Sequence, residues 1–148
     1  MDRAERALNY FGNNFNCSQA VFTAFATDYG FDEKTALKIG TNLGGGARSG
    51  ELCGAVSGAL MALGLICGHS ESSDNEGKVR SYALSEEFVR RFTEANGSVV
   101  CRELLDYDLS KPEQMAVIKE KNLFRTVCPK MVESAVRILE EMLAEQKN

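Results

Sequence analysis

The chain has 148 residues, five cysteines and a formal net charge of −4. This length is typical of one ordinary domain that buries its own core. The acidic balance provides no basic stripe that would neutralise phosphates, which argues against nucleic acid as a partner.

The N-terminal residues and the cysteines bear on the cellular location of the protein. Residues 1–6 include four charged side chains and no apolar stretch follows them, so we expect no secretory signal and a cytoplasmic location. In a reducing cytoplasm, cysteines indicate metal ligands or catalytic thiols rather than structural disulfides. The odd number of cysteines also leaves one thiol unpaired in any disulfide scheme.

The hydrophobic periodicity in the first third of the chain is helical. Three helices are predicted, over residues 4–11, 17–28 and 32–42. Gly12-Asn13-Asn14 ends the first helix, Gly30 terminates the second in a left-handed conformation, and Asp32 caps the third.

A glycine-rich loop, Gly44 to Gly50, leads into an uncharged segment from Leu52 to Gly68. Its length is at the lower end of the roughly 17–25 residues that a membrane-spanning helix needs. Five of its residues are glycine or serine. We therefore interpret it as a buried central helix and predict no membrane association.

The second half of the chain continues the helical pattern after a polar loop over residues 69–77. Helices are predicted over residues 78–95 and 129–145, and a third begins at a capping box with an early proline, Ser110-Lys-Pro-Glu113. Only residues 98–100 are ambiguous as a strand. We predict an all-α fold in which residues 1–148 form a single-domain bundle of about six or seven helices.

Four of the five cysteines each open a helical pattern: Cys17, Cys53, Cys101 and Cys128. A thiol in the first helical turn meets unpaired backbone N–H groups and the positive end of the helix dipole. Both favour the thiolate, which is the form that attacks or binds metal. This position therefore indicates redox or metal chemistry, although cysteine also serves as an inert small hydrophobe.

Helical spacing places the same four sulfurs on the core side of their helices. We therefore predict that they converge at one end of the bundle, with Cys67 outside the group as a core residue. Cys53 is expected to have the lowest thiol pKa, because glycines leave its helix start open and Arg48 is near in sequence.

The order Cys17, then Cys53-Gly-Ala-Val-Ser-Gly58, then Cys101 and Cys128 resembles the C_GCAxxG_C_C family. The chain matches a Cys-Gly-Ala-x-x-Gly motif at every fixed position, and the resemblance covers nearly its whole length. It implies a small helical protein with a redox role and marks the same four cysteines. Some relatives carry twin-arginine export signals, which implies a prosthetic group such as an iron–sulfur cluster; we find no such signal in this chain.

Four glycines are candidates for cofactor binding, and each has a second interpretation. Gly54 and Gly58 either let another helix approach closely, which we favour, or admit a bulky cluster. Gly45 and Gly46 lie in a loop that would cradle an anion before a helix. Arg48 in this loop is interpreted as a solvated side chain, and so is His69, the only histidine.

The leading hypothesis is a redox protein in which Cys17, Cys53, Cys101 and Cys128 form one site. These cysteines act either as ligands of an iron–sulfur cluster or other metal, which we slightly favour, or as thiols in disulfide exchange. The expected partner is a redox protein of unknown identity. The alternative is a helical interaction module that forms homo-oligomers through its small-residue faces and has incidental cysteines.

Overall fold

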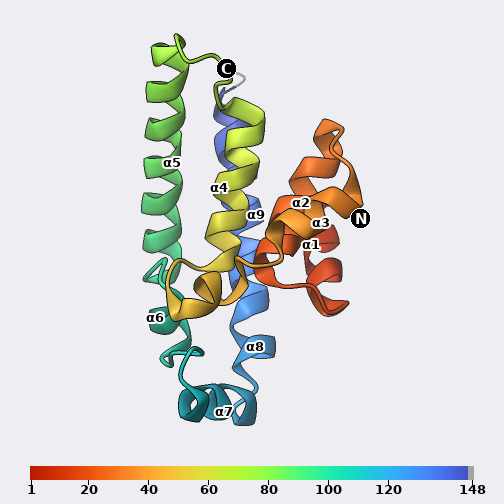
Figure 1. Ribbon diagram of the computed structural model, residues 1–148, viewed down its shortest axis with the longest axis vertical. Coiled ribbons are helices and arrows are strands. Elements are labelled where there is room, and N and C mark those ends of the chain that lie inside the picture. The colour runs from red at the N-terminus through yellow and green to blue at the C-terminus, as the bar shows by residue number, and fades with distance from the viewer. Residues whose placement is uncertain (147–148) are drawn as a thin grey trace.

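The computed structural model describes residues 1–146 and confirms the all-α prediction. Its described residues form nine α-helices (Figure 1). Their bounds are α1 (Arg3–Gly12), α2 (Cys17–Ala26), α3 (Glu33–Gly40), α4 (Gly54–Cys67), α5 (Asn75–Asn96), α6 (Cys101–Leu105), α7 (Pro112–Glu120), α8 (Leu123–Thr126) and α9 (Cys128–Gln146).

The number of helices exceeds the predicted six or seven because α6 and α8 have only five and four residues. The sequence indicated a helix start at Cys101 but not the extent of α6, and α8 contains too little of the helical repeat to show in the sequence. The polar loop also ends earlier than predicted, since Asp74 accepts a hydrogen bond from the Gly77 amide and caps α5.

Several predicted helix ends are confirmed. Asp32 caps α3, and Gly30 has the left-handed φ of 83° that was expected of it. The capping box at Ser110 is wrong: Lys111 occupies the N-cap of α7 and makes no side-chain cap. The Ser110 hydroxyl instead donates to Asp108 at 2.6 Å, within the turn that precedes the helix.

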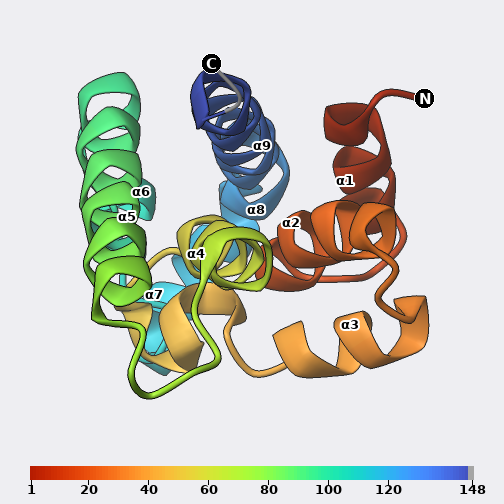
Figure 2. The ribbon, with the colours of Figure 1, turned by 90° about the horizontal axis from the view of Figure 1, so that it is seen from above.

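Helix α4 lies at the centre of the molecule, as predicted for the uncharged segment. Figure 2 shows it between α5 and α2, with α9 beside it. Helices α4 and α9 both begin near the middle of Figure 1, above α7 and α8, and run upward, whereas α5 returns downward. Within residues 1–146, no helix combines the length and the apolar character needed to cross a membrane.

The closest helix packing in the fold joins α4 to α2 through Gly54 and Gly58. A Cβ at Gly54 would lie 3.2 Å from the amide nitrogen of Ser18, and a Cβ at Gly58 would lie 2.8 Å from the Ser18 carbonyl oxygen and 3.2 Å from the Phe22 nitrogen. Later residues of α4 thus face later residues of α2, so the two helices run in the same general direction and begin at the same end of the core.

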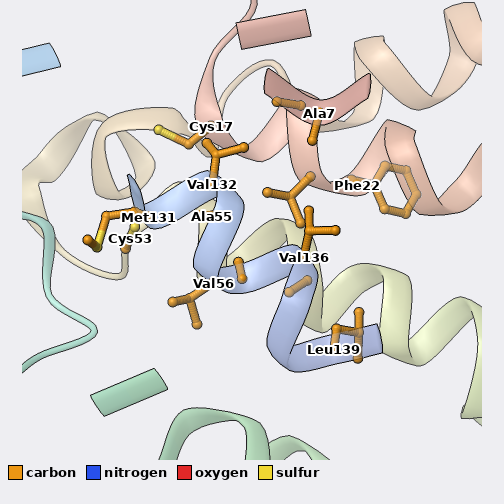
Figure 3. Packing of buried hydrophobic residues seen from close by; sticks show 14 of the residues in the cluster. Ala7, Cys17, Phe22, Cys53, Ala55, Val56, Met131, Val132, Val136 and Leu139 are labelled. Atoms are coloured by element: carbon orange, nitrogen blue, oxygen red, sulfur yellow. The ribbon is translucent and has the colours of Figure 1, made fainter. Parts of the chain in front are cut away.

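The buried hydrophobic side chains form one cluster, to which α1, α2, α4, α5 and α9 all contribute. Figure 3 shows Cys17, Cys53 and Met131 at one end of the labelled residues, and Leu139 at the other. Val56 and Leu139 are fully buried. The starts of α2, α4 and α9 therefore border one end of a continuous apolar core.

We predict opposite effects for alanine at two glycines of α4. Gly58→Ala is expected to lower the free energy of unfolding by about 1–3 kcal/mol, because the new methyl group meets the backbone of α2. Gly64→Ala is the matched control: no atom lies within 4 Å of its Cβ position, so it gains up to about 1 kcal/mol of helix propensity. Urea unfolding measures both, and equal stabilisation by the two variants would contradict this packing.

Candidate functional site

Backbone hydrogen bonds between two distant segments hold Cys53 next to Cys101. The amide of Cys53 donates to the Val99 carbonyl at 2.7 Å, and the amide of Cys101 donates to the Glu51 carbonyl at 2.6 Å. These bonds flank an antiparallel bridge between Leu52 and Val100. The strand-like character of residues 98–100 is thus a single bridge that joins the starts of α4 and α6.

The other two cysteines, Cys17 and Cys128, open helices α2 and α9. Asn16 caps α2 in a capping box with Gln19: the Gln19 amide donates to the Asn16 side chain at 2.9 Å, and the Asn16 amide donates to the Gln19 side chain at 2.8 Å. Helices α2 and α9 pack against each other, and Cys128 lies close enough to Cys17 to raise the pKa of its thiol.

All four cysteines line one cavity of about 220 Å³. Their exposed fractions are 9% for Cys17 and Cys128, 7% for Cys101 and 6% for Cys53. Cys67 lies at the far end of α4, half-buried against the core, and does not line the cavity. All four helix-start cysteines thus line one cavity, in agreement with their predicted position at one end of the bundle, and Cys67 lies apart from them.

The walls of this cavity are mainly apolar. They include Phe11, Met115, Phe124 and Met131, and the polar side chains that contribute are Asn16 and Arg48. Arg48 is the one charged residue among those that line the cavity. Because Arg48 is also solvent-exposed, it lies at the mouth of the cavity.

The four candidate glycines separate into two groups. Gly45 and Gly54 line the cavity, whereas Gly46 and Gly58 do not. Gly54 and Gly58 both face α2, in agreement with the packing interpretation that the sequence favoured. A Cβ at Gly46 would lie 2.3 Å from the backbone nitrogen of Glu51, so this glycine allows the loop to fold tightly before α4.

The loop over the cavity adopts an unusual left-handed turn. Gly45, Gly46, Ala47 and Arg48 have consecutive positive φ values of 67°, 64°, 57° and 61°. This conformation is free of penalty for glycine, but it costs about 1–2 kcal/mol for each residue with a Cβ. Backbone strain of this kind concentrates at functional sites, and here the strained residues stand beside the four cysteines.

The predicted order of thiol pKa values is wrong. Burial raises the pKa of Cys53 to about 12, and the nearby amides of Ala55 and Val56 offset only part of this rise. Burial likewise raises the pKa of Cys101 to about 12, and the Cys53 and Cys17 thiols add to the rise. Loss of hydration at the helix start thus outweighs the favourable amides.

Hydrogen bonding with Cys128, together with burial, raises the pKa of Cys17 well above its usual value. Burial also raises the pKa of the half-buried Cys67. The structure therefore gives Cys53 no lower pKa than Cys67. Burial in the cavity thus favours the neutral thiols of Cys17, Cys53 and Cys101.

The residues present fit a sulfur-bound cofactor in their chemistry. Four cysteines are the ligand set of [2Fe–2S] and [4Fe–4S] clusters. In the part of the chain that the structure describes, no three His, Cys, Asp or Glu side chains are grouped closely enough to hold one metal ion. The cysteine side chains instead line a common space.

The fold and site together define a small all-helical protein with four buried cysteines around one apolar cavity. The family model described as "Putative redox-active protein (C_GCAxxG_C_C)" matches residues 15–142, so the chain belongs to this family. The family's label writes glycine before cysteine, whereas Cys53 precedes Gly54 here. No curated protein and no solved structure matches the chain.

Sequence reasoning missed the non-cysteine walls of the cavity. Phe11, Phe124 and Met131 come from three different helices, and no spacing in the sequence connects them. Arg48 was interpreted as a solvated loop residue, and it is exposed, but it also borders the cavity. The three consecutive glycines that precede it were the available signal of an unusual backbone.

We predict that Ala47→Gly maintains or raises stability, by up to about 1 kcal/mol, because glycine relieves the left-handed strain. The control is Ala83→Gly at an exposed position inside α5, where the same substitution costs about 1 kcal/mol. Thermal unfolding of the two variants measures the difference. Equal destabilisation by both substitutions would show that the left-handed turn is absent in solution.

A further prediction concerns thiol reactivity in metal-free folded protein. At pH 8, iodoacetamide should modify Cys67 before Cys53 and Cys101, because a thiol with a pKa near 12 is only about one part in ten thousand thiolate. Modification of Cys53 and Cys101 should accelerate up to about pH 12, the value to which burial raises their pKa. Peptide mass spectrometry gives each rate, and fast labelling of Cys53 at pH 8 would restore the original prediction.

Proposed function

We propose that this member of a redox-active family is an electron-transfer protein that holds an iron–sulfur cluster through Cys17, Cys53, Cys101 and Cys128. The observation that carries the proposal is that all four cysteines, from four different helix starts, line one largely apolar cavity. A single redox pair needs two thiols, and the cavity brings together twice that number.

The arrangement of the sulfurs supports a cluster over a single ion. A tetrahedral metal ion requires all its ligands to meet at bonds of about 2.3 Å. Here the four cysteines border a volume of about 220 Å³, which provides room for a group of several atoms. When bound, such a cluster would supply the ability to accept and release single electrons.

The protein's own residues would perform three tasks around this group. The cysteine thiols would lose their protons on binding, because a cationic core replaces the hydration that burial removes. The amides of Ala55 and Val56 lie near the Cys53 sulfur, and hydrogen bonds to ligand sulfurs raise the reduction potential. Phe11, Phe124 and Met131 would keep bulk water from the sulfurs.

A second candidate function rests on the interaction between Cys17 and Cys128. In this alternative the two thiols lose two electrons and two protons to form one S–S bond, and a disulfide in a partner protein is reduced to two thiols. The raised pKa of Cys17 opposes this chemistry, because attack on a disulfide requires a thiolate. We therefore place it second.

A helical interaction module remains the third candidate, but the small-residue face proposed for it is occupied. Gly54 and Gly58 of α4 lie against α2 of the same chain, so they are not free to contact a second copy. The electron-transfer proposal instead implies a redox protein partner, which would exchange electrons with the four-cysteine site.

Anaerobic purification tests the proposed function. We expect protein that absorbs visible light and contains iron and acid-labile sulfide together. Replacing Cys17, Cys53, Cys101 or Cys128 by serine should abolish or strongly weaken this absorption, because a hydroxyl is a poor substitute for a thiolate ligand. Cys67→Ser is the matched control and should leave the spectrum unchanged.

Other outcomes separate the alternatives. Colourless, iron-free protein that interconverts between forms differing by two thiols would support the dithiol function, with only Cys17 and Cys128 essential. Colourless protein whose thiols resist mild oxidants would contradict both redox functions and leave the interaction module.

A further inference from the structure

The charge distribution around the four-cysteine cavity is one-sided. Among the residues of 1–146 that line it, Arg48 is the only ionised side chain, and no carboxylate joins them. The ion pair between Arg102 and Glu51 at 2.6 Å involves residues outside the lining. The lining therefore carries one positive charge, while the Asp108 carboxylate acts on Cys101 from outside it, and a positive lining is suited to contents with negative charge.

The position of Arg48 depends on the left-handed turn. A Cβ at Gly45 would lie 2.7 Å from Nη1 of Arg48, so the guanidinium group rests where only glycine leaves space. Arg48 itself has a φ of 61°, which is rare for a residue with a side chain. Two independent features, the strained backbone and the missing side chain at Gly45, thus hold this cation beside the cysteines.

We propose that Arg48 is a potential-setting residue whose positive charge stabilises the reduced state of the four-cysteine site and raises its reduction potential. The proposal rests on the proposed function, in which these cysteines form a redox centre. Arg48 is not a ligand in this account. It is a positioning residue that acts through its charge.

The physical reason is the charge of a thiolate-bound cluster. Four thiolates contribute four negative charges, the iron–sulfide core cancels only part of them, and each electron gained adds one more. Burial in apolar surroundings strengthens the effect of a nearby cation on that added charge, and net charge is one of the factors that set cluster potentials. Arg48 also lowers the pKa of Cys101, whereas burial, the Cys53 and Cys17 thiols and the Asp108 carboxylate raise it.

The test is an anaerobic redox titration of wild-type protein, Arg48→Gln, Arg48→Lys and Arg102→Gln, followed by visible absorption. Arg48→Gln should shift the equilibrium about tenfold toward the oxidised form, which is about 59 mV for one electron. Arg48→Lys retains the charge and should stay close to wild type. Arg102→Gln makes the same change of charge next to Cys101 in sequence but outside the cavity lining, so its shift should be clearly smaller.

Two results would overturn the proposal: an unchanged potential in Arg48→Gln, or a loss in Arg48→Lys as large as that in Arg48→Gln. Wild-type protein without iron would contradict the cluster but would still test Arg48 through the rate of Cys101 alkylation at pH 9. In that case Arg48→Gln should slow the reaction several-fold and Arg48→Lys should not. Equal rates in all variants would refute the role of Arg48 independently of the cluster.

Discussion

The site depends on how closely the backbone of α4 approaches that of α2. Gly54 and Gly58 have no Cβ, and any Cβ at Gly58 would meet the Ser18 carbonyl oxygen at 2.8 Å. The contact aligns the two helices so that Cys17 and Cys53 begin at the same end of the core. The Leu52–Val100 bridge then adds Cys101, and the packing of α9 against α2 adds Cys128.

Burial on this scale changes the chemistry that helix starts usually promote. The amides near Cys53 favour its thiolate, yet burial raises its pKa to about 12. A buried thiol of this kind is a poor nucleophile at neutral pH, but it becomes a good ligand once a cation replaces the lost hydration. This balance supports the proposed cluster over thiol chemistry that needs an exposed thiolate.

Sequence periodicity and cysteine position were sufficient to predict the helices and the four-cysteine convergence. The regularly spaced apolar residues of α9 predict which of its faces is buried, and the lack of charge in α4 predicts that this helix is buried too. A cysteine in the first turn on a buried face must point toward the core. The resemblance to the family rests on the same residues. The start of α6 at Cys101 was predicted from the cysteine position, whereas α8 was missed because its four residues contain barely one helical turn.

The remaining features of the site depend on tertiary structure that no local pattern encodes. The predicted order of thiol pKa values was wrong because a sequence shows where a helix begins, and hence where its free amides lie, but does not show how deeply each thiol is buried. The place of Arg48 depends on a left-handed turn and on contact with Gly45, three residues earlier. Helical spacing assumes a right-handed backbone and therefore does not predict this contact. The Gly44-Gly45-Gly46 run signals an unusual backbone, but not its direction.

Native mass spectrometry of anaerobically prepared protein tests the central claim most directly, because it weighs the intact chain with whatever the cavity holds. The account predicts one species per chain that is heavier than the polypeptide by the iron and sulfide of a single cluster. Denaturation should release this mass and leave a chain with all its thiols reduced. A folded species with the mass of the polypeptide alone, or lighter by two hydrogens, would contradict the account.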